Sequence, residues 1–213
     1  MALKAPTSRP TDASGVKMIN AEIFAMTYGA FVRFAVEQAR AGCPDSSWAH
    51  SVNETLRQMG FRMGERLVDD FFIRDAEMSA KSQSVGPQGV CATLRQVVDT
   101  LARRAMPLFL GMADGDIKVE EAQPDPNSPP RTTAFDLVFA RESPLTMFVE
   151  LPKQLRDAGV WYSNVICGAI EGAVRMLEFP AGGVKAKFIS DRLVTPSTET
   201  RIRVQHTMQD ERR

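Results

Sequence analysis

The chain has 213 residues, of which 44% are hydrophobic and 24% are charged, so it can bury a core without help from metals or disulfides. Its 26 basic and 26 acidic side chains give a formal net charge of zero, which argues against the basic surface of a nucleic-acid-binding protein. Three cysteines without a CxxC pair and only two histidines argue against a disulfide framework and a zinc site.

The chain is predicted to begin with a flexible leader over residues 1–17, which is rich in Pro, Ser and Thr and has no apolar segment typical of a signal peptide. Asn20 is expected to cap a helix that runs from about Ala21 to Ala39. This helix carries a wide apolar face that includes Tyr28 and Phe31. Nowhere in the chain do about 18 apolar residues follow one another, so no membrane-spanning helix is predicted.

A second helix is predicted from Val52 to Ile73, because its apolar residues recur three or four positions apart. Gly60 and Gly64 lie four apart beside this apolar stripe, and each costs roughly 1 kcal/mol against alanine in a helix. Two such glycines favour a place where another backbone approaches closely. A loop is predicted to follow from Asp75 to Gly89.

A third helix is predicted from about Cys91 to Leu110, with Leu94 and Val98 among its inward-facing residues. Pro107 should kink or end its last turn, because proline lacks an N–H and its ring clashes with the preceding turn. The proline-rich and acidic stretch from Asp114 to Arg131 is predicted to be a loop.

Strands are expected in the second half of the chain, where the apolar period changes to two. One strand contains Phe135, Leu137 and Phe139, and the next contains Met147, Val149 and Leu151. A fourth helix is predicted over about Val160 to Phe179, followed by strands over Val184–Ser190 and Thr200–Thr207. The predicted fold is α+β: one domain with a twisted, antiparallel, four-stranded sheet packed by about four helices.

The search for catalytic motifs finds no Walker A sequence, GxSxG, HExxH or GxGxxG after a strand, so no catalytic residue and no metal site are predicted. Cys91 is placed near a helix start, where free N–H groups and the helix dipole favour a thiolate. On these features alone, we favour a structural role for Cys91, as a small residue at a helix entry, over a role as a reactive thiol. Cys167 lies in an apolar helix and is expected to be part of the core.

Five segments of the sequence carry a resemblance to a known family: EIFAMTYGAFV (22–32), MGFRMGERLVDDF (59–71), the helix 91–111 that ends in Leu-Gly, VELP (149–152) and YSNVICGAIEGAVRML (162–177) with the later KAKFISD. In this order they resemble the small subunits of the TRAPP vesicle-tethering complex, and among these the palmitoylated Bet-three type. The resemblance places a TRAPP small-subunit domain over residues 18–208 and a short tail over 209–213. It implies a scaffold subunit, not an enzyme, that forms part of a Rab GTPase nucleotide-exchange factor in endoplasmic-reticulum-to-Golgi transport.

By the same resemblance, Cys91 matches the family cysteine that carries a covalent or buried fatty acyl chain, with palmitate expected. Arg95 matches a family arginine on the same helix, and Leu94 and Val98 are expected to support the acyl channel. The expected partners are other TRAPP small subunits, a Rab-family GTPase through the assembled complex, and no nucleic acid. The expected location is cytoplasmic, with peripheral association to Golgi and endoplasmic reticulum membranes through the complex.

The first two helices present more apolar surface than one sheet face needs, which predicts a homodimer. Its interface is expected to include Tyr28, Phe31, Gly60 and Gly64. Two alternatives remain open at this point: a sensor of related fold that binds a hydrophobic ligand reversibly, and an acyl-transferring enzyme that uses Cys91.

Overall fold

A computed structural model describes residues 19–42, 47–82 (backbone only for 75–82), 93–113, 115–177, 183–196 and 198–208. The predicted leader (1–17) and tail (209–213) lie outside the described residues, so the domain limits remain predictions. The helices are α1 (Ala21–Gly42), α2 (Trp48–Ser82), α3 (Leu94–Thr100), η1 (Leu101–Ala105), α4 (Met106–Leu110), α5 (Lys153–Asp157) and α6 (Asn164–Met176). The strands are β1 (Ile117–Ala122), β2 (Thr132–Phe139), β3 (Val184–Ser190) and β4 (Thr200–Thr207).

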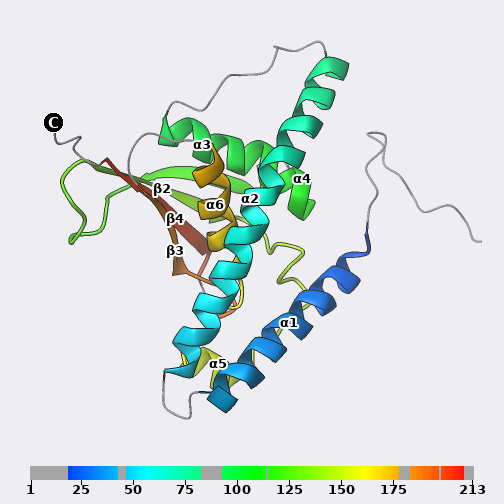
Figure 1. Cartoon of the computed structure of the whole chain (residues 1–213), viewed down its shortest axis with the longest axis vertical. Coiled ribbons are helices and arrows are strands. Elements are labelled where there is room, and N and C mark those ends of the chain that lie inside the picture. Colours follow the sequence, from blue (N-terminus) through cyan, green and yellow to red (C-terminus); the bar gives the residue numbers. More distant parts are fainter. Residues whose placement is uncertain are drawn as a thin grey trace, which may run out of the picture.

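The strands form one antiparallel sheet in the order β1-β2-β4-β3. Helices α3 and α6 pack against the sheet, α2 packs on α6, and α1 packs on α2 (Figure 1). The core fills the space between these layers and is centred on fully buried residues such as Leu56, Val98, Leu137, Ile170 and Ile202. The predicted α+β class and the four-stranded antiparallel sheet in a single domain are confirmed.

Helix α1 begins at Ala21, as predicted from the Asn20 cap. The Asn20 Oδ1 accepts hydrogen bonds from the N–H groups of Glu22 and Ile23 at 2.7 and 3.3 Å, which satisfies two donors that the helix itself leaves without partners. Helix α2 begins earlier than predicted and continues past Ile73 to Ser82. Its last turns contain Ala, Glu, Met and Lys, which favour a helix over the predicted loop. The remainder of that predicted loop, residues 83–89, lies outside the described residues.

The third predicted helix is continuous from Leu94 to Leu110 but changes its winding along the way. Thr93 and Gln96 form a capping box at its start, with the Gln96 N–H donating to Thr93 Oγ1 and the Thr93 N–H donating to Gln96 Oε1. Residues 101–105 are π-helical, and the N–H of Met106 donates to the carbonyl of Leu101. This wide turn comes directly before Pro107, whose ring clashes with a regular α-helical turn, so the predicted distortion is present.

Two predictions about the strands are wrong. The predicted strand over residues 147–151 is a series of turns, in which the carbonyl of Ser143 accepts from the N–H groups of Thr146 and Met147. The missing strand is β1, which lies within the stretch predicted as a loop. Its pairing with β2 joins Val119 to Leu137 and Ile117 to Phe139. The fourth helix is also shorter than predicted, because residues 160–161 are irregular and residues 162–163 form a turn before α6 begins at Asn164.

Candidate functional site

Helices α2 and α6 cross at four glycines. A Cβ atom added to Gly60 would lie 2.0 Å from the carbonyl oxygen of Val165, and one added to Gly64 would lie 2.1 Å from that of Ala169. On α6, a Cβ at Gly168 or Gly172 would meet the backbone of α2 equally closely. The close backbone approach expected at Gly60 and Gly64 is therefore present, but its partner is α6 of the same chain. These two glycines give no support to a contact between copies.

An ion pair ties the same crossing to the edge of the sheet. Arg57 on α2 donates from Nε and Nη2 to the two carboxylate oxygens of Glu171 on α6, at 2.9 and 2.5 Å. The N–H of Ala186 on β3 donates to the same carboxylate at 2.7 Å. Burial raises the pKa of Glu171, while the Ala186 N–H and Arg57 act in the opposite direction. One buried carboxylate thus holds three elements together.

Tyr28 lies on the inner face of α1, buried against the chain before α6. Its hydroxyl donates to the carbonyl of Tyr162 at 2.5 Å, and the two rings meet edge to face with their centroids 5.0 Å apart. Burial and the neighbouring Tyr162 raise the pKa of the Tyr28 hydroxyl, and burial raises the pKa of Tyr162 to about 12. Both phenols are therefore neutral. Cys167 is fully buried nearby, as expected, and burial raises the pKa of its thiol.

The proposed acylation site, Cys91, lies outside the described residues, which resume at Thr93. The helix that follows it buries one face: Leu94 is 5% exposed and Val98 is 0% exposed. The Arg95 side chain is 54% exposed and lies beside this buried face. Its Nε pairs with Asp99 at 3.1 Å, and its guanidinium lies over the ring of Phe135, 5.5 Å from the centroid.

The outer face of α1 exposes large apolar side chains beside one surface ion pair, Arg33–Glu37. Ile23, Met26 and Phe34 lie on the side of the helix opposite to its buried residues, and Phe31 flanks them. Met26 is 74% exposed and Phe34 is 59% exposed. The helix therefore has two apolar faces, of which one packs on the body of the protein. We call Ile23, Met26, Phe31 and Phe34 the α1 outer face.

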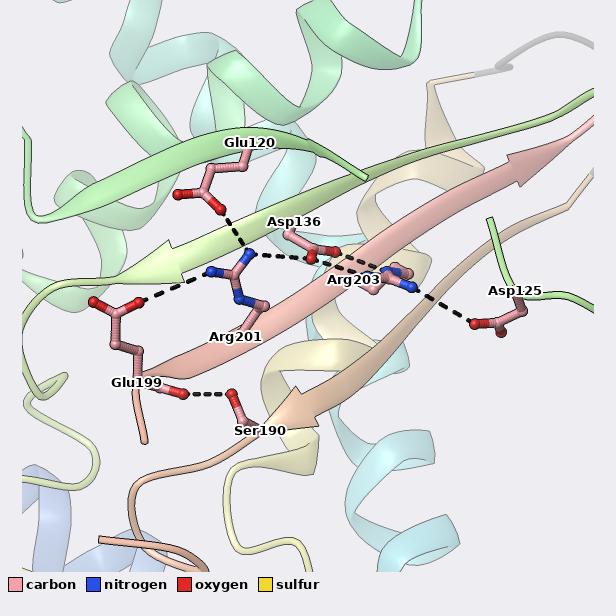
Figure 2. A network of polar contacts seen from close by, with 7 residues as sticks. All are labelled: Glu120, Asp125, Asp136, Ser190, Glu199, Arg201 and Arg203. Carbon is pink, nitrogen blue, oxygen red and sulfur yellow. Dashed lines mark hydrogen bonds and ion pairs between the residues drawn. The ribbon is translucent and has the colours of Figure 1, made fainter. Parts of the chain in front are cut away.

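A network of charged residues crosses the side of the sheet that faces away from α6, and no motif in the sequence predicts it. Figure 2 shows Asp136 on β2 between Arg201 and Arg203 of β4, with bonds of 2.8 to 3.3 Å. Arg201 also binds Glu120 on β1, at 2.6 Å. Asp125, in the loop between β1 and β2, binds both Arg203 and the Lys187 ammonium of β3. The network spans all four strands and buries Asp136 to 3% exposure.

The described part of the chain has neither a membrane-spanning helix nor a cluster of metal ligands. Its helices include none with the length and apolar character needed to cross a bilayer. Its His, Cys, Asp and Glu side chains include no group of three or more arranged to hold a metal ion.

Comparison with known proteins gives one family. Residues 24–205 match the model of the family described as transport protein particle (TRAPP) component. The chain is 32% identical over 197 residues to transport protein particle subunit bet3 of Schizosaccharomyces pombe, covering 92% of this chain and 90% of the relative. It is 31% identical over 197 residues to the trafficking protein particle complex subunit 3 homolog of Caenorhabditis elegans, covering 91% and 89%.

A solved structure agrees with these relatives. It is that of trafficking protein particle complex subunit 3 from Naegleria fowleri, covalently bound to palmitic acid. Its TM-score with this chain is 0.63 at 29% sequence identity, over 90% of this chain and 98% of that one. The chain therefore belongs to the TRAPP component family, as a homologue of its Bet3, or subunit 3, members.

Proposed function

We propose that this protein is a scaffold subunit of a TRAPP-like vesicle-tethering complex that binds its neighbours through the α1 outer face. The observation that carries the proposal is the second apolar face of α1, which the protein's own body leaves exposed. Exposed apolar surface of this extent on one helix is typical of a protein–protein interface.

The energetics favour a contact with another protein. Burying a Leu- or Phe-sized side chain completely contributes about 1.5–3 kcal/mol, and the four side chains of the α1 outer face are 53–74% exposed, so burying them contributes on the order of 5 kcal/mol per copy. Association itself costs an estimated 4–15 kcal/mol. In a symmetric dimer the same face is buried on both copies, so the free energy gained by burial is doubled. The doubled gain exceeds the lower part of the association cost. A homodimer through α1 is thus the simplest assembly, and another TRAPP small subunit with a similar face could replace one copy.

We further propose that Cys91 carries a fatty acyl chain, as a thioester, that enters the apolar interior beside α3. The buried face of Leu94 and Val98 begins three residues after this cysteine, which supports an acyl chain that enters the core. The match to a subunit 3 structure that is covalently bound to palmitic acid supports the same chemistry. An acyl chain of this kind would stabilise the fold and would not tether the protein to a membrane, because one exposed chain binds bilayers only marginally.

Within such a complex, the subunit would contribute binding surface to nucleotide exchange on a Rab-family GTPase in endoplasmic-reticulum-to-Golgi transport. Exchange requires only that the assembled complex binds the nucleotide-free GTPase more tightly than the loaded one, so no residue of this chain needs to perform covalent chemistry on a substrate. Its membrane association would be peripheral and would depend on the complex.

The proposal is tested by co-purification from the native cells, with identification of the bound subunits. The wild-type protein should recover other TRAPP small subunits, whereas Ile23→Asp/Met26→Asp should lose those that bind α1. Met208→Asp is the matched control, because it places a negative charge on an exposed methionine that follows directly after β4. Recovery of no TRAPP subunit by the folded wild-type protein would rule out the scaffold role.

The acylation is tested by intact mass with and without hydroxylamine, which cleaves thioesters. Protein from its own cells should show a hydroxylamine-sensitive mass increase that Cys91→Ser removes. Burying an acyl chain contributes about 0.8 kcal/mol per methylene, so the variant should also melt at a lower temperature. Cys167→Ser should retain the modification, because that thiol is fully buried in the core. An unmodified wild-type protein would contradict the acylation.

A further inference from the structure

Three hydroxyl-bearing residues of this chain are followed directly by proline: Ser128, Ser143 and Thr195. A Ser-Pro or Thr-Pro pair is what proline-directed protein kinases recognise, because their pocket for the next residue suits a proline ring that has no backbone N–H to satisfy. Of the three pairs, only that of Ser128 has a basic residue three positions after the hydroxyl, Arg131. A cation at this position is the second feature that the cyclin-dependent group of these kinases recognises. The sequence SPPR (128–131) therefore carries both features.

The fold separates Ser128 from Ser143. The Ser143 residue is 5% exposed, its hydroxyl lies 3.5 Å from the Thr146 hydroxyl, and its carbonyl accepts from the Thr146 N–H at 2.9 Å. A kinase could not bind this buried segment unless the core around it unfolded. Ser128, in contrast, lies in the loop between β1 and β2, half-buried between the exposed residues Asn127 and Pro129. Of the two Ser-Pro pairs, the folded protein thus offers that of Ser128.

A short turn holds Ser128 in this loop. Its N–H donates to the carbonyl of Asp125 at 2.8 Å, and the Thr132 hydroxyl donates to the carbonyl of Pro129 at 2.8 Å. Surface hydrogen bonds of this kind are readily exchanged for bonds to water, so the segment can open while the strands on both sides of it stay paired. Pro129 and Pro130 then favour extended conformations, the form in which a kinase cleft holds its substrate.

The turn also places Ser128 beside a carboxylate that is bound to the sheet. The Asp125 carboxylate binds the Lys187 ammonium of β3 and lies 3.8 Å from the Arg203 guanidinium of β4, which Figure 2 shows. A phosphoserine carries a charge of about −1.5 to −2 at pH 7. Lys187 is 44% exposed and has three donors, so an added phosphate at this end of the network meets a cation that can bind it.

We propose that Ser128 is a phosphorylation site for a proline-directed protein kinase, with ATP as the phosphoryl donor. The Ser128 hydroxyl oxygen forms a bond to the γ-phosphorus of ATP, while the bond from that phosphorus to the β–γ bridging oxygen breaks and ADP leaves. The hydroxyl proton passes to a base of the kinase. The site is separate from the α1 outer face, so the proposal does not depend on the proposed scaffold role.

The probe for this site is a cyclin-dependent kinase with MgATP, applied to the purified full-length chain below its melting temperature. Peptide mass spectrometry should find phosphate on Ser128 and none on Ser143. Pro129→Ala removes the recognised proline. Pro130→Ala is the matched control, because it removes a neighbouring exposed proline and leaves the Ser-Pro pair intact. Phosphorylation of Pro129→Ala should be at least about tenfold slower than that of Pro130→Ala.

Two further variants test which hydroxyl is modified. Ser128→Ala should abolish phosphate incorporation, and Thr195→Ala should leave it unchanged, because the exposed Thr195 is followed by proline but has no cation three positions later. The proposal is overturned if the folded wild-type protein is not phosphorylated at Ser128, if Ser143 is modified as fast as Ser128, or if the two proline variants react at the same rate.

Discussion

The four glycines between α2 and α6 show how single residues set the distance between two helices. Each of Gly60, Gly64, Gly168 and Gly172 lacks a Cβ where the carbonyl or amide of the other helix lies within 3 Å of that position. A glycine inside a helix costs about 1 kcal/mol relative to alanine. Here that cost is offset by a backbone-to-backbone contact that any side chain would prevent, and the contact brings Arg57 within reach of Glu171.

Gly64→Ala should therefore destabilise the protein although alanine is the better helix former. The added methyl would lie 2.1 Å from a backbone oxygen, so the helices must separate, and overpacking of this kind costs about 1–3 kcal/mol. Chemical denaturation should show a lower free energy of unfolding by about 2 kcal/mol.

The control for this prediction is Gly29→Ala, in the middle of α1. A Cβ at Gly29 would make only an ordinary contact, 3.5 Å from the Tyr162 hydroxyl. This variant should be neutral or more stable by about 0.4–1 kcal/mol. If Gly64→Ala were as stable as Gly29→Ala, the close crossing of α2 and α6 would be wrong.

At the scale of elements, charged residues join the strands on the outer side of the sheet, the side that commonly faces solvent in an antiparallel sheet. Asp136 receives hydrogen bonds from Arg201 and Arg203, and the long arginine side chains lie across the strands around it (Figure 2). Ala134 and Val138, which flank Asp136 on this side of β2, are each 3% exposed. The aliphatic stems of arginines cover apolar surface in this way.

Asp136→Ala should be strongly destabilising, because it leaves two arginines, 27% and 19% exposed, without their shared carboxylate. Breaking a buried ion pair from one side costs about 3–5 kcal/mol. Glu120→Ala is the matched control: its side chain is 48% exposed and binds the same Arg201, so it should cost less than about 1 kcal/mol. If thermal unfolding showed the same loss of stability for both variants, Asp136 would not be the main carboxylate that holds these arginines.

The sequence predicted the helices better than the strands, for physical reasons that particular residues show. The Asn20 cap, the helical conformation of α2 and the Pro107 distortion depend on local chemistry and are present, although Met63 of the apolar stripe predicted for α2 is 44% exposed. Strand β1 has only two alternating apolar residues, Ile117 and Val119. Acidic residues lie among them and four prolines follow, so the composition of this segment is that of a loop. It becomes a strand because β2 pairs with it.

The candidate site was predictable only in part. Two glycines one turn apart predicted a close backbone approach, but no local signal in α2 said whether its partner was another copy or α6. The sequence likewise could not place Arg203 beside Asp136, because the two are 67 positions apart and meet only through strand pairing. Cys91 was singled out by resemblance, and its acylation remains a prediction.

At the scale of the whole molecule, the layers follow one another from the sheet to α6, α2 and α1 (Figure 1). Each inner layer is covered by the next, and α1 is the last. A terminal layer needs a polar outer side if the protein is to remain alone in solution, yet the α1 outer face presents Ile23, Met26, Phe31 and Phe34. The order of layers therefore ends on a surface suited to a second protein.

The measurement that tests this central claim most directly is the mass of the purified protein by light scattering at micromolar concentration. The account predicts a dimer for the wild-type chain and for Met208→Asp, and a folded monomer for Ile23→Asp/Met26→Asp, because two carboxylates would then be buried without partners in the interface. A wild-type monomer, or a dimer that persists in the double variant, would contradict assembly through the α1 outer face.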